Sequence, residues 1–205
     1  DPDALENAVV RAIIGDRELH KSQRVVLSSL RAGNSVLAVM ATGRGKSLTF
    51  QVHAACEALA HHTASLFVYP LRALIADQAF HINEALAPFG INACTLTGES
   101  APDERRQVFA GLEDGSVDIV LTTPEFLVCH APEFAATGRI GFVVVDEAHH
   151  IGLSRAGHRP AYAQLGSTIA QMGNPVVLAL TATSDEAVTS DIDRVLPVAG
   201  HVVDD

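Results

Sequence analysis

The sequence predicts an α/β domain with a mostly parallel central sheet, on three observations. Short apolar runs alternate with helical patterns, the runs are rich in β-branched residues and apolar on both faces, and Gly, Pro or polar residues bound most of them. Runs of that kind are typical of strands in a parallel sheet covered on both sides. Their alternation with helices indicates βαβ units with right-handed crossovers. We therefore expect a three-layer αβα domain.

The apolar runs give the expected strands, and the periodic segments between them give the expected helices. Strands are expected at 35–40, 65–70, 91–97, 117–123, 140–146 and 175–181. Helices are expected near 46–60, 71–87, 102–111, 124–130, 160–171 and 184–195, with Ser184 as a candidate cap and Gly33 and Gly90 as candidate ends. Two earlier helices, around 3–14 and 22–32, form a lead-in over residues 1–34. Because no repeat or linker interrupts the pattern, residues 1–205 are expected to form a single domain.

Composition narrows the class of protein. Hydrophobic residues make up 48% and aromatic residues 5%, so one aliphatic core is expected. No apolar run approaches the ~18 residues of a membrane span, and three separated cysteines favour a reducing, cytoplasmic location. The net charge of −10 argues against a domain that coats nucleic acid, but it is compatible with a local groove. The first residues, DPDALENAVV, suggest a piece of a longer chain.

The stretch MATGRGKSLTF, residues 40–50, lies between an expected strand and an expected helix. Its glycines let backbone N–H groups turn toward phosphate at the positive end of that helix. Lys46 can reach the β- and γ-phosphates, and the Ser47 hydroxyl can ligate Mg²⁺. The common pattern also has a glycine six positions before the lysine, where this chain has Met40. The context predicts a nucleotide-binding loop made of Thr42, Gly43, Arg44, Gly45, Lys46 and Ser47. Arg44 either contacts phosphate or faces solvent.

A second candidate site is FVVVDEAHH, in which apolar strand residues directly precede Asp146 and Glu147. An Asp at that position can hold Mg²⁺, usually through water, while the neighbouring Glu positions and deprotonates the attacking water. Both side chains should face the loop, because ligands of open α/β sheets bind beyond the carboxyl ends of the strands. Lys46 and Glu147 are thus the predicted catalytic residues, and Ser47 and Asp146 the predicted metal ligands.

Six motifs, in family order, resemble those of RecQ-like superfamily 2 helicases. MATGRGKSLTFQ is similar to the RecQ phosphate loop, in which the outer glycine is not required, and residues 146–149 spell the DEAH signature. ELHKSQ (18–23) resembles the adenine-reading motif, with Gln23 as its glutamine. The remaining three resemble motifs Ia, Ib and III: VYPLRALIADQ (68–78), LTTPEFL (121–127) and ALTATSDEAVTSDI (179–192).

The resemblance implies a RecA-like P-loop NTPase lobe, the first of two, in an ATP-dependent DNA helicase. Such a lobe binds ATP and Mg²⁺ and couples hydrolysis to movement on, or unwinding of, nucleic acid, here single-stranded DNA. The resemblance implies that His149 couples the nucleotide site to motif III through Thr181 or Thr183. It also implies a nucleic-acid path over Pro70, Arg72, Thr123, Pro124, Glu125, His158 and Arg159. The second lobe, which carries the arginine finger in this family, is expected elsewhere in the full-length chain, so the lobe alone should be nearly inactive.

Two departures from the family leave alternatives open. Leu19 and His20 stand where the family has an aromatic–Arg pair, which implies weaker adenine selectivity. Residues 150–160, HIGLSRAGHRP, lack the Trp and Phe of the family's DNA-sensing loop, although Arg155, His158 and Arg159 are candidate polar contacts. One alternative is therefore a DNA-dependent ATPase, translocase or regulatory module, fused to another enzyme such as a nuclease, that does not unwind. Another is a nucleotide-binding scaffold that does not hydrolyse, against which the intact Lys46, Ser47, Asp146 and Glu147 argue.

Overall fold

The computed structural model describes residues 1–41, 43, 45–154 and 157–204 of the chain. Thr42 and Arg44 of the predicted loop, and Arg155 further along, lie outside the described residues. Seven strands form one sheet in the order β3-β4-β2-β5-β6-β1-β7, and every described strand pair is parallel. The strands are β1 (Val36–Val39), β2 (Ala64–Val68), β3 (Ala93–Leu96), β4 (Ile119–Thr122), β5 (Ile140–Val145), β6 (Val176–Thr181) and β7 (Gly200–Val203).

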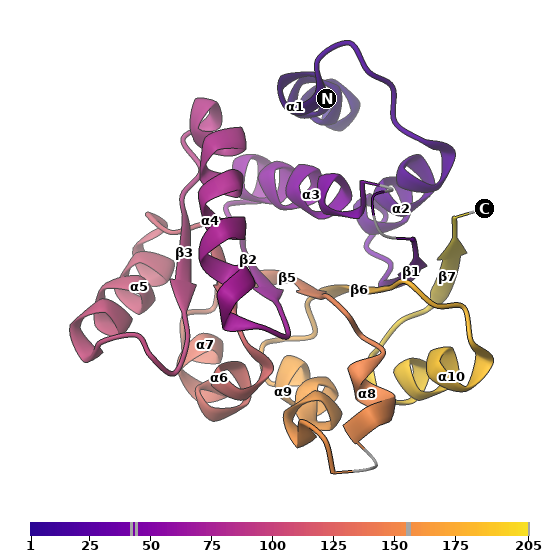
Figure 1. The fold of residues 1–205 in the computed structure, drawn as a ribbon. Coiled ribbons are helices and arrows are strands. Elements are labelled where there is room, and N and C mark those ends of the chain that lie inside the picture. Colours follow the sequence, from indigo (N-terminus) through magenta and orange to yellow (C-terminus); the bar gives the residue numbers. More distant parts are fainter. Residues whose placement is uncertain (42, 44, 155–156, 205) are drawn as a thin grey trace.

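Helices cover both faces of this sheet (Figure 1). One side carries α1 (Pro2–Ile14), α2 (Lys21–Arg31), α3 (Lys46–His61), α4 (Arg72–Leu86) and the 3-10 turn η1 (Ala87–Phe89). The other side carries α5 (Pro102–Asp114), α6 (Pro124–Cys129), α7 (Ala131–Ala136), α8 (His150–Leu153), the 3-10 turn η3 (Pro160–Gln164), α9 (Leu165–Ala170) and α10 (Glu186–Val195). In the described part of the chain, no helix has the length and apolar character to cross a membrane.

The core consists of two apolar clusters, one on each face of the sheet. Alternate residues of a strand join alternate clusters: in β2, Leu66 and Val68 face the cluster under α5–α10, whereas Phe67 and the following Tyr69 face the cluster under α1–α4. Successive side chains of a strand point to opposite faces, so a strand with apolar residues throughout is buried on both sides. The three valines of β5, residues 143–145, are buried in this way. The central strands are therefore held firmly up to their carboxyl ends, where the candidate site lies.

The structure confirms the six expected strands and the lead-in helices to within about two residues at most ends, and Gly33 and Gly90 follow helical segments with positive φ. Several elements differ from these expectations. The helix expected at 160–171 is divided into η3 and α9, because Pro160 opens a 3-10 turn. The segment after α6 continues as α7, which was not expected. The N-cap of α10 is Asp185 rather than Ser184, and its carboxylate accepts from the backbone N–H groups of Ala187 and Val188.

Gly166 in α9 lies against the end of α10, and this contact gives a test of the packing. A Cβ atom at Gly166 would lie 1.9 Å from the Val195 carbonyl oxygen, so the backbones would have to separate. Gly166→Ala should therefore destabilise the fold by about 1–3 kcal/mol, the usual cost of overpacking. Thermal unfolding should show a lower Tm than that of the parent chain. Gly98→Ala, at a position with open space around it, is the matched control. Equal Tm values for the two variants would contradict the packing described.

Candidate nucleotide site and nucleic-acid interface

Within the predicted phosphate loop, Gly45 caps the N-terminus of α3. Gly45 has a φ of 72°, in the left-handed region, and a Cβ there would lie 2.6 Å from Gln23 Nε2. Only glycine fits this position without strain. Lys46 and Ser47 therefore begin the first turn of α3, where free backbone N–H groups and the helix dipole favour an anion.

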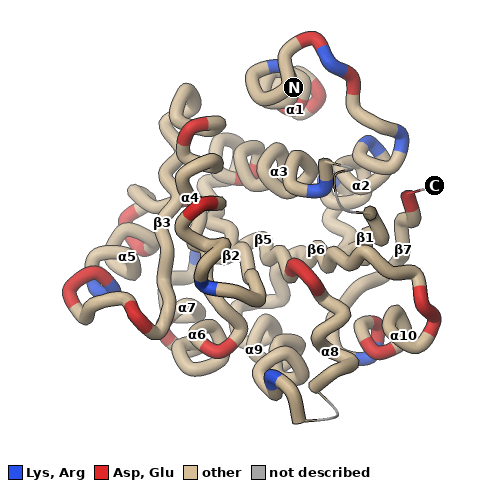
Figure 2. Tube along the Cα trace, viewed as in Figure 1, with Lys and Arg blue, Asp and Glu red and all other residues tan. Residues whose placement is uncertain are grey.

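The Lys46 ammonium lies between the two predicted acidic residues. Its Nζ is 3.4 Å from Asp146 Oδ1 and 3.6 Å from Glu147 Oε1. The blue start of α3 and the red end of β5 in Figure 2 face one another. The structure thus brings together residues that are about 100 positions apart in the sequence. This arrangement places a cation beside a carboxylate pair, as the predicted phosphate, metal and water-activating roles require.

The backbone around Glu147 is held from both neighbouring strands. Asp146 N donates to the Val68 carbonyl of β2 at 2.9 Å, and Ala148 N donates to the Leu180 carbonyl of β6 at 2.8 Å. Between them Glu147 adopts a φ of 49°, which is uncommon for a residue other than glycine. Strain of this kind persists where the surroundings over-determine the conformation. The turn therefore directs the Glu147 carboxylate toward Lys46.

Asp146 is suited to a divalent cation. Burial raises the pKa of its carboxyl group, and the Lys46 charge opposes that rise. Among the described residues, its buried Oδ1 accepts no well-formed hydrogen bond, although Lys46 is nearby. Carboxylate and hydroxyl oxygens are the ligands that Mg²⁺ takes in such sites. A buried carboxylate oxygen whose nearby cation is Lys46, beside the N-terminus of α3, fits the predicted Mg²⁺ role of Asp146, with Ser47 on the facing helix.

Gln23 connects the lead-in to the loop. Its Nε2 donates to the Gly45 carbonyl at 3.0 Å, and its Oε1 accepts from His20 N at 2.8 Å, which closes a capping box at the start of α2. The side chain is 3% exposed. The structure therefore places Gln23 against the phosphate loop, and its reading of adenine stays a prediction.

The predicted coupling residues lie at or beyond the ends of two strands: His149 follows β5, Thr181 ends β6 and Thr183 follows it. His149 Nδ1 lies 3.3 Å from Glu147 Oε2, so His149 contacts the predicted base. Thr181 is buried, its carbonyl accepts from Met40 N at 3.0 Å, and its hydroxyl accepts from Thr183 N at 3.4 Å. Within the described residues, no hydrogen bond joins His149 to either threonine, and their coupling stays a prediction.

A cavity of about 480 Å³ gathers most of the predicted nucleic-acid contacts. Five of them line it: Pro70, Arg72, Thr123, Glu125 and Arg159. Pro124 is buried at the start of α6, and His158 is exposed outside the cavity lining. The Thr123 hydroxyl accepts from Phe126 N at 3.2 Å, so it caps α6. The loops after β2 and β4 thus meet, as expected for neighbouring parallel strands.

Both arginines of this cavity are paired with carboxylates. Arg159 donates from Nε and Nη2 to the two oxygens of Glu125 at 3.0 and 2.9 Å, and it also donates to the Pro70 carbonyl. Arg72 Nη1 donates to Glu99 Oε1 at 2.6 Å. A bidentate arginine–carboxylate pair has the geometry with which arginine also holds phosphate. Sequence reasoning missed Glu99, because it belongs to no motif and lies 27 residues from its partner.

A series of ring contacts joins the two places. His149 stacks on His150 with ring centroids 4.6 Å apart, His150 lies 5.1 Å from the Tyr162 ring, and the Arg159 guanidinium lies 5.2 Å from that ring. Burial lowers the pKa of His150, which keeps that ring neutral. Sequence reasoning missed both His150 and Tyr162 in this role. Tyr162 is buried, whereas His149, His150 and Arg159 are half-buried, and no local pattern signals the contact between segments 146–150 and 159–162.

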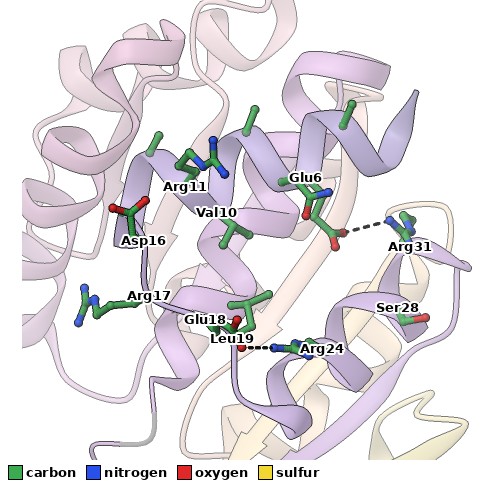
Figure 3. Close-up of a pocket in the computed structure, with 15 residues that line it drawn as sticks. Glu6, Val10, Arg11, Asp16, Arg17, Glu18, Leu19, Arg24, Ser28 and Arg31 are labelled. Atoms are coloured by element: carbon green, nitrogen blue, oxygen red, sulfur yellow. Dashed lines mark hydrogen bonds and ion pairs between the residues drawn. The ribbon is translucent and has the colours of Figure 1, made fainter.

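A cavity of about 1170 Å³ lies elsewhere, between α1, the loop after it and α2 (Figure 3). Four arginines and three carboxylates line it. Two of the arginines are paired across it, Arg24 with Glu18 and Arg31 with Glu6. Because these charges nearly balance, the cavity has no strong preference for phosphate, and we place the nucleotide at the carboxyl edge of the sheet.

Comparison with known proteins shows to which family the chain belongs. The family model of the DEAD/DEAH box helicases matches residues 20–191. The ATP-dependent DNA helicase RecQ of Haemophilus influenzae is 33% identical over 190 residues, which cover 91% of this chain and 29% of that protein. RecQ of Pasteurella multocida is 35% identical over 196 residues, covering 91% of this chain and 28% of that protein. The chain thus spans less than a third of the length of these relatives.

Solved structures share the fold. The helicase MrfA, in a crystal structure with DNA, has a TM-score of 0.80 at 22% identity over 98% of this chain and 29% of that chain. A hypothetical ATP-dependent RNA helicase from Sulfolobus tokodaii has a TM-score of 0.69 at 19% identity over 97% of this chain and 56% of that chain. These neighbours and the parallel sheet identify a RecA-like three-layer α/β domain. The chain therefore belongs to the DEAD/DEAH box helicase family, as a RecQ-like first helicase lobe.

Proposed function

We propose that this chain is the ATP-binding and hydrolysing motor lobe of a RecQ-like DNA helicase, which couples Mg-ATP hydrolysis to movement on or unwinding of DNA. The observation that carries the proposal is the position of Lys46, at the start of α3 and between Asp146 and Glu147. A phosphate chain at this helix end would meet an ammonium, backbone N–H groups and a carboxylate pair together. That combination suits phosphoryl transfer, in which positioning and charge stabilisation supply most of the catalysis.

Each residue has one role in the proposal. Lys46 holds the β- and γ-phosphates, Ser47 and Asp146 hold Mg²⁺, and Glu147 accepts a proton from the attacking water. Mg²⁺, when bound, neutralises charge that develops on the phosphate oxygens. Gln23, together with the loop from Thr42 to Ser47, completes the nucleotide site. Motion of phosphate-bound Lys46 away from the carboxylates would free Asp146 for the metal.

We further propose that single-stranded DNA crosses the cavity lined by Arg72, Thr123 and Arg159. Phosphate oxygens would replace the carboxylates of Glu99 and Glu125 on the two arginines, since both ligands use the same donor geometry. The proposal includes a second lobe elsewhere in the full-length protein and a cytoplasmic location. The resemblance to relatives more than three times as long as this chain supports the former, and three free cysteines support the latter.

Removal of the Lys46 ammonium tests the phosphate site. Lys46→Ala should weaken ATP binding at least about tenfold, since hydrogen bonds to charged groups contribute ~1.5–3 kcal/mol. Titration of a fluorescent ATP analogue measures this affinity, and circular dichroism should show an unchanged fold, because Lys46 is not part of the apolar core. Arg106→Ala, which removes an exposed cation on α5 outside the predicted motifs, is the matched control. Equal affinities of the parent and the Lys46 variant would rule out the phosphate role.

Removal of the Glu147 carboxylate separates binding from chemistry. In the full-length protein, Glu147→Gln should retain Mg-ATP binding but lose about 10²–10⁴-fold in turnover, the contribution of a general base. Steady-state phosphate release and nucleotide titration measure the two quantities. Glu113→Gln, at an exposed position on α5, should leave both unchanged. Normal hydrolysis by the Glu147 variant would show that another group activates the water.

The 205-residue chain itself should be a poor ATPase. An arginine finger contributes ~10³–10⁵-fold in rate, and the family resemblance assigns it to the second lobe. ATP turnover should therefore stay near background with or without single-stranded DNA, and weak DNA binding should decline further with added salt. The comparison is turnover of residues 1–205 beside that of the longer native protein. Strong DNA-stimulated turnover by the short chain would mean that it completes its own site, for example by dimerising, and would refute the half-site proposal.

A further inference from the structure

Among the buried oxygen atoms that lack a hydrogen-bond partner in the described residues, two lie at the carboxyl edge of the sheet on the face that carries α3. They are the Tyr69 hydroxyl and Asp146 Oδ1. Tyr69 is 4% exposed and directly follows β2. A buried hydroxyl without a partner costs free energy, because it has given up its hydrogen bonds to water. Phenylalanine would fill the same space without that cost, so the ligand-free fold does not account for the oxygen.

The strand register places these two residues side by side. Val68 of β2 pairs with Val145 of β5, and Asp146 N continues the ladder to the Val68 carbonyl at 2.9 Å. Register partners in parallel strands point to the same face of a sheet. Tyr69 belongs to the apolar cluster beneath α3, and Asp146 meets Lys46 of α3. Both side chains therefore face the helix that begins with the phosphate-binding lysine.

Electrostatics link the two side chains as well. Burial raises the pKa of Tyr69, and the negative charge of Asp146 raises it further, so the hydroxyl keeps its proton and can donate it. Without nucleotide, Lys46 is the cation beside Asp146. A phosphate chain would draw Lys46 away, and the buried carboxylate would then need another donor to hold its charge and orientation.

We propose that Tyr69 is a further positioning residue of the nucleotide site, whose hydroxyl donates to the Asp146 carboxylate, directly or through one water, when Mg-nucleotide is bound. The hydrogen bond occupies one side of the carboxylate and leaves the other for the metal or its water shell. This inference rests on the proposed function, and it extends the site to a residue outside the loop and the DEAH quartet. Tyr69 acts through Asp146 and takes no part in the transfer of protons.

Tyr69→Phe removes the hydroxyl and keeps the ring. In the 205-residue chain, affinity for a fluorescent ATP analogue with Mg²⁺ should fall about tenfold, which corresponds to ~1.4 kcal/mol. With EDTA in place of Mg²⁺, the affinity should equal that of the parent, because Lys46 and the loop are intact. The Tm without ligand should be unchanged or higher, since no hydrogen bond is lost. A merely structural role of Tyr69 would lower the Tm and both affinities together, and that outcome would overturn the proposal.

Two further variants make the assignment specific. Ser65→Ala removes another buried hydroxyl without a partner in the described structure, near the amino end of β2, and should leave the Mg²⁺ dependence unchanged. In an Asp146→Asn background, Tyr69→Phe should have no additional effect on Mg²⁺-dependent affinity. Additive losses of affinity in the double variant would overturn the role of Tyr69 but not the proposed function. Mg²⁺ dependence of Tyr69→Phe equal to that of the parent would have the same consequence. Absence of nucleotide binding by the parent chain would refute the proposed function, and with it this inference.

Discussion

Two backbone hydrogen bonds hold the end of β5 between its neighbours, one from Asp146 N to Val68 and one from Ala148 N to Leu180, and the geometry of the candidate site depends on them. They enclose Glu147, whose left-handed backbone would otherwise relax. The valines before Glu147 are buried on both faces of the sheet, so the close packing around them keeps the strand rigid. Catalytic geometry must hold to within a fraction of an ångström, and a strand end fixed in this manner meets that requirement better than a free loop.

The segment after β5 also reaches the cavity proposed for nucleic acid. Its contacts form an unbroken series from one place to the other: Glu147, His149, His150, Tyr162, Arg159 and Glu125. Every step is a side-chain contact, and all of these residues except Glu125 lie between positions 147 and 162. A displacement of Arg159 would therefore shift the Tyr162 and His150 rings, and with them His149 beside Glu147. Such a series is a physical route for coupling, and demonstration of coupling requires a measured change in one site when the other is filled.

The charge distribution reconciles the proposed binding of polyanions with the net charge of −10. Lys46 lies at the N-terminus of α3, where the backbone adds its own positive potential. In the other cavity, Arg72 and Arg159 are already paired with Glu99 and Glu125. A phosphate must compete with these carboxylates, so the exchange conserves hydrogen bonds and gains little affinity for a single contact. Binding that depends on several such exchanges would be sensitive to salt and to a complete groove.

The sequence alone was sufficient for the strands, the lead-in helices and the positions of Lys46 and Asp146, because apolar periodicity and strand–loop–helix order are local properties of the chain. It was insufficient for the division at Pro160 into η3 and α9, for α7, and for Asp185 as the cap, where neighbouring signals compete. Only the tertiary structure revealed Glu99 beside Arg72, His150 against Tyr162, and Tyr69 in register with Asp146. These pairs depend on strand order and on which face a side chain takes, and both are decided when distant segments pack around one core.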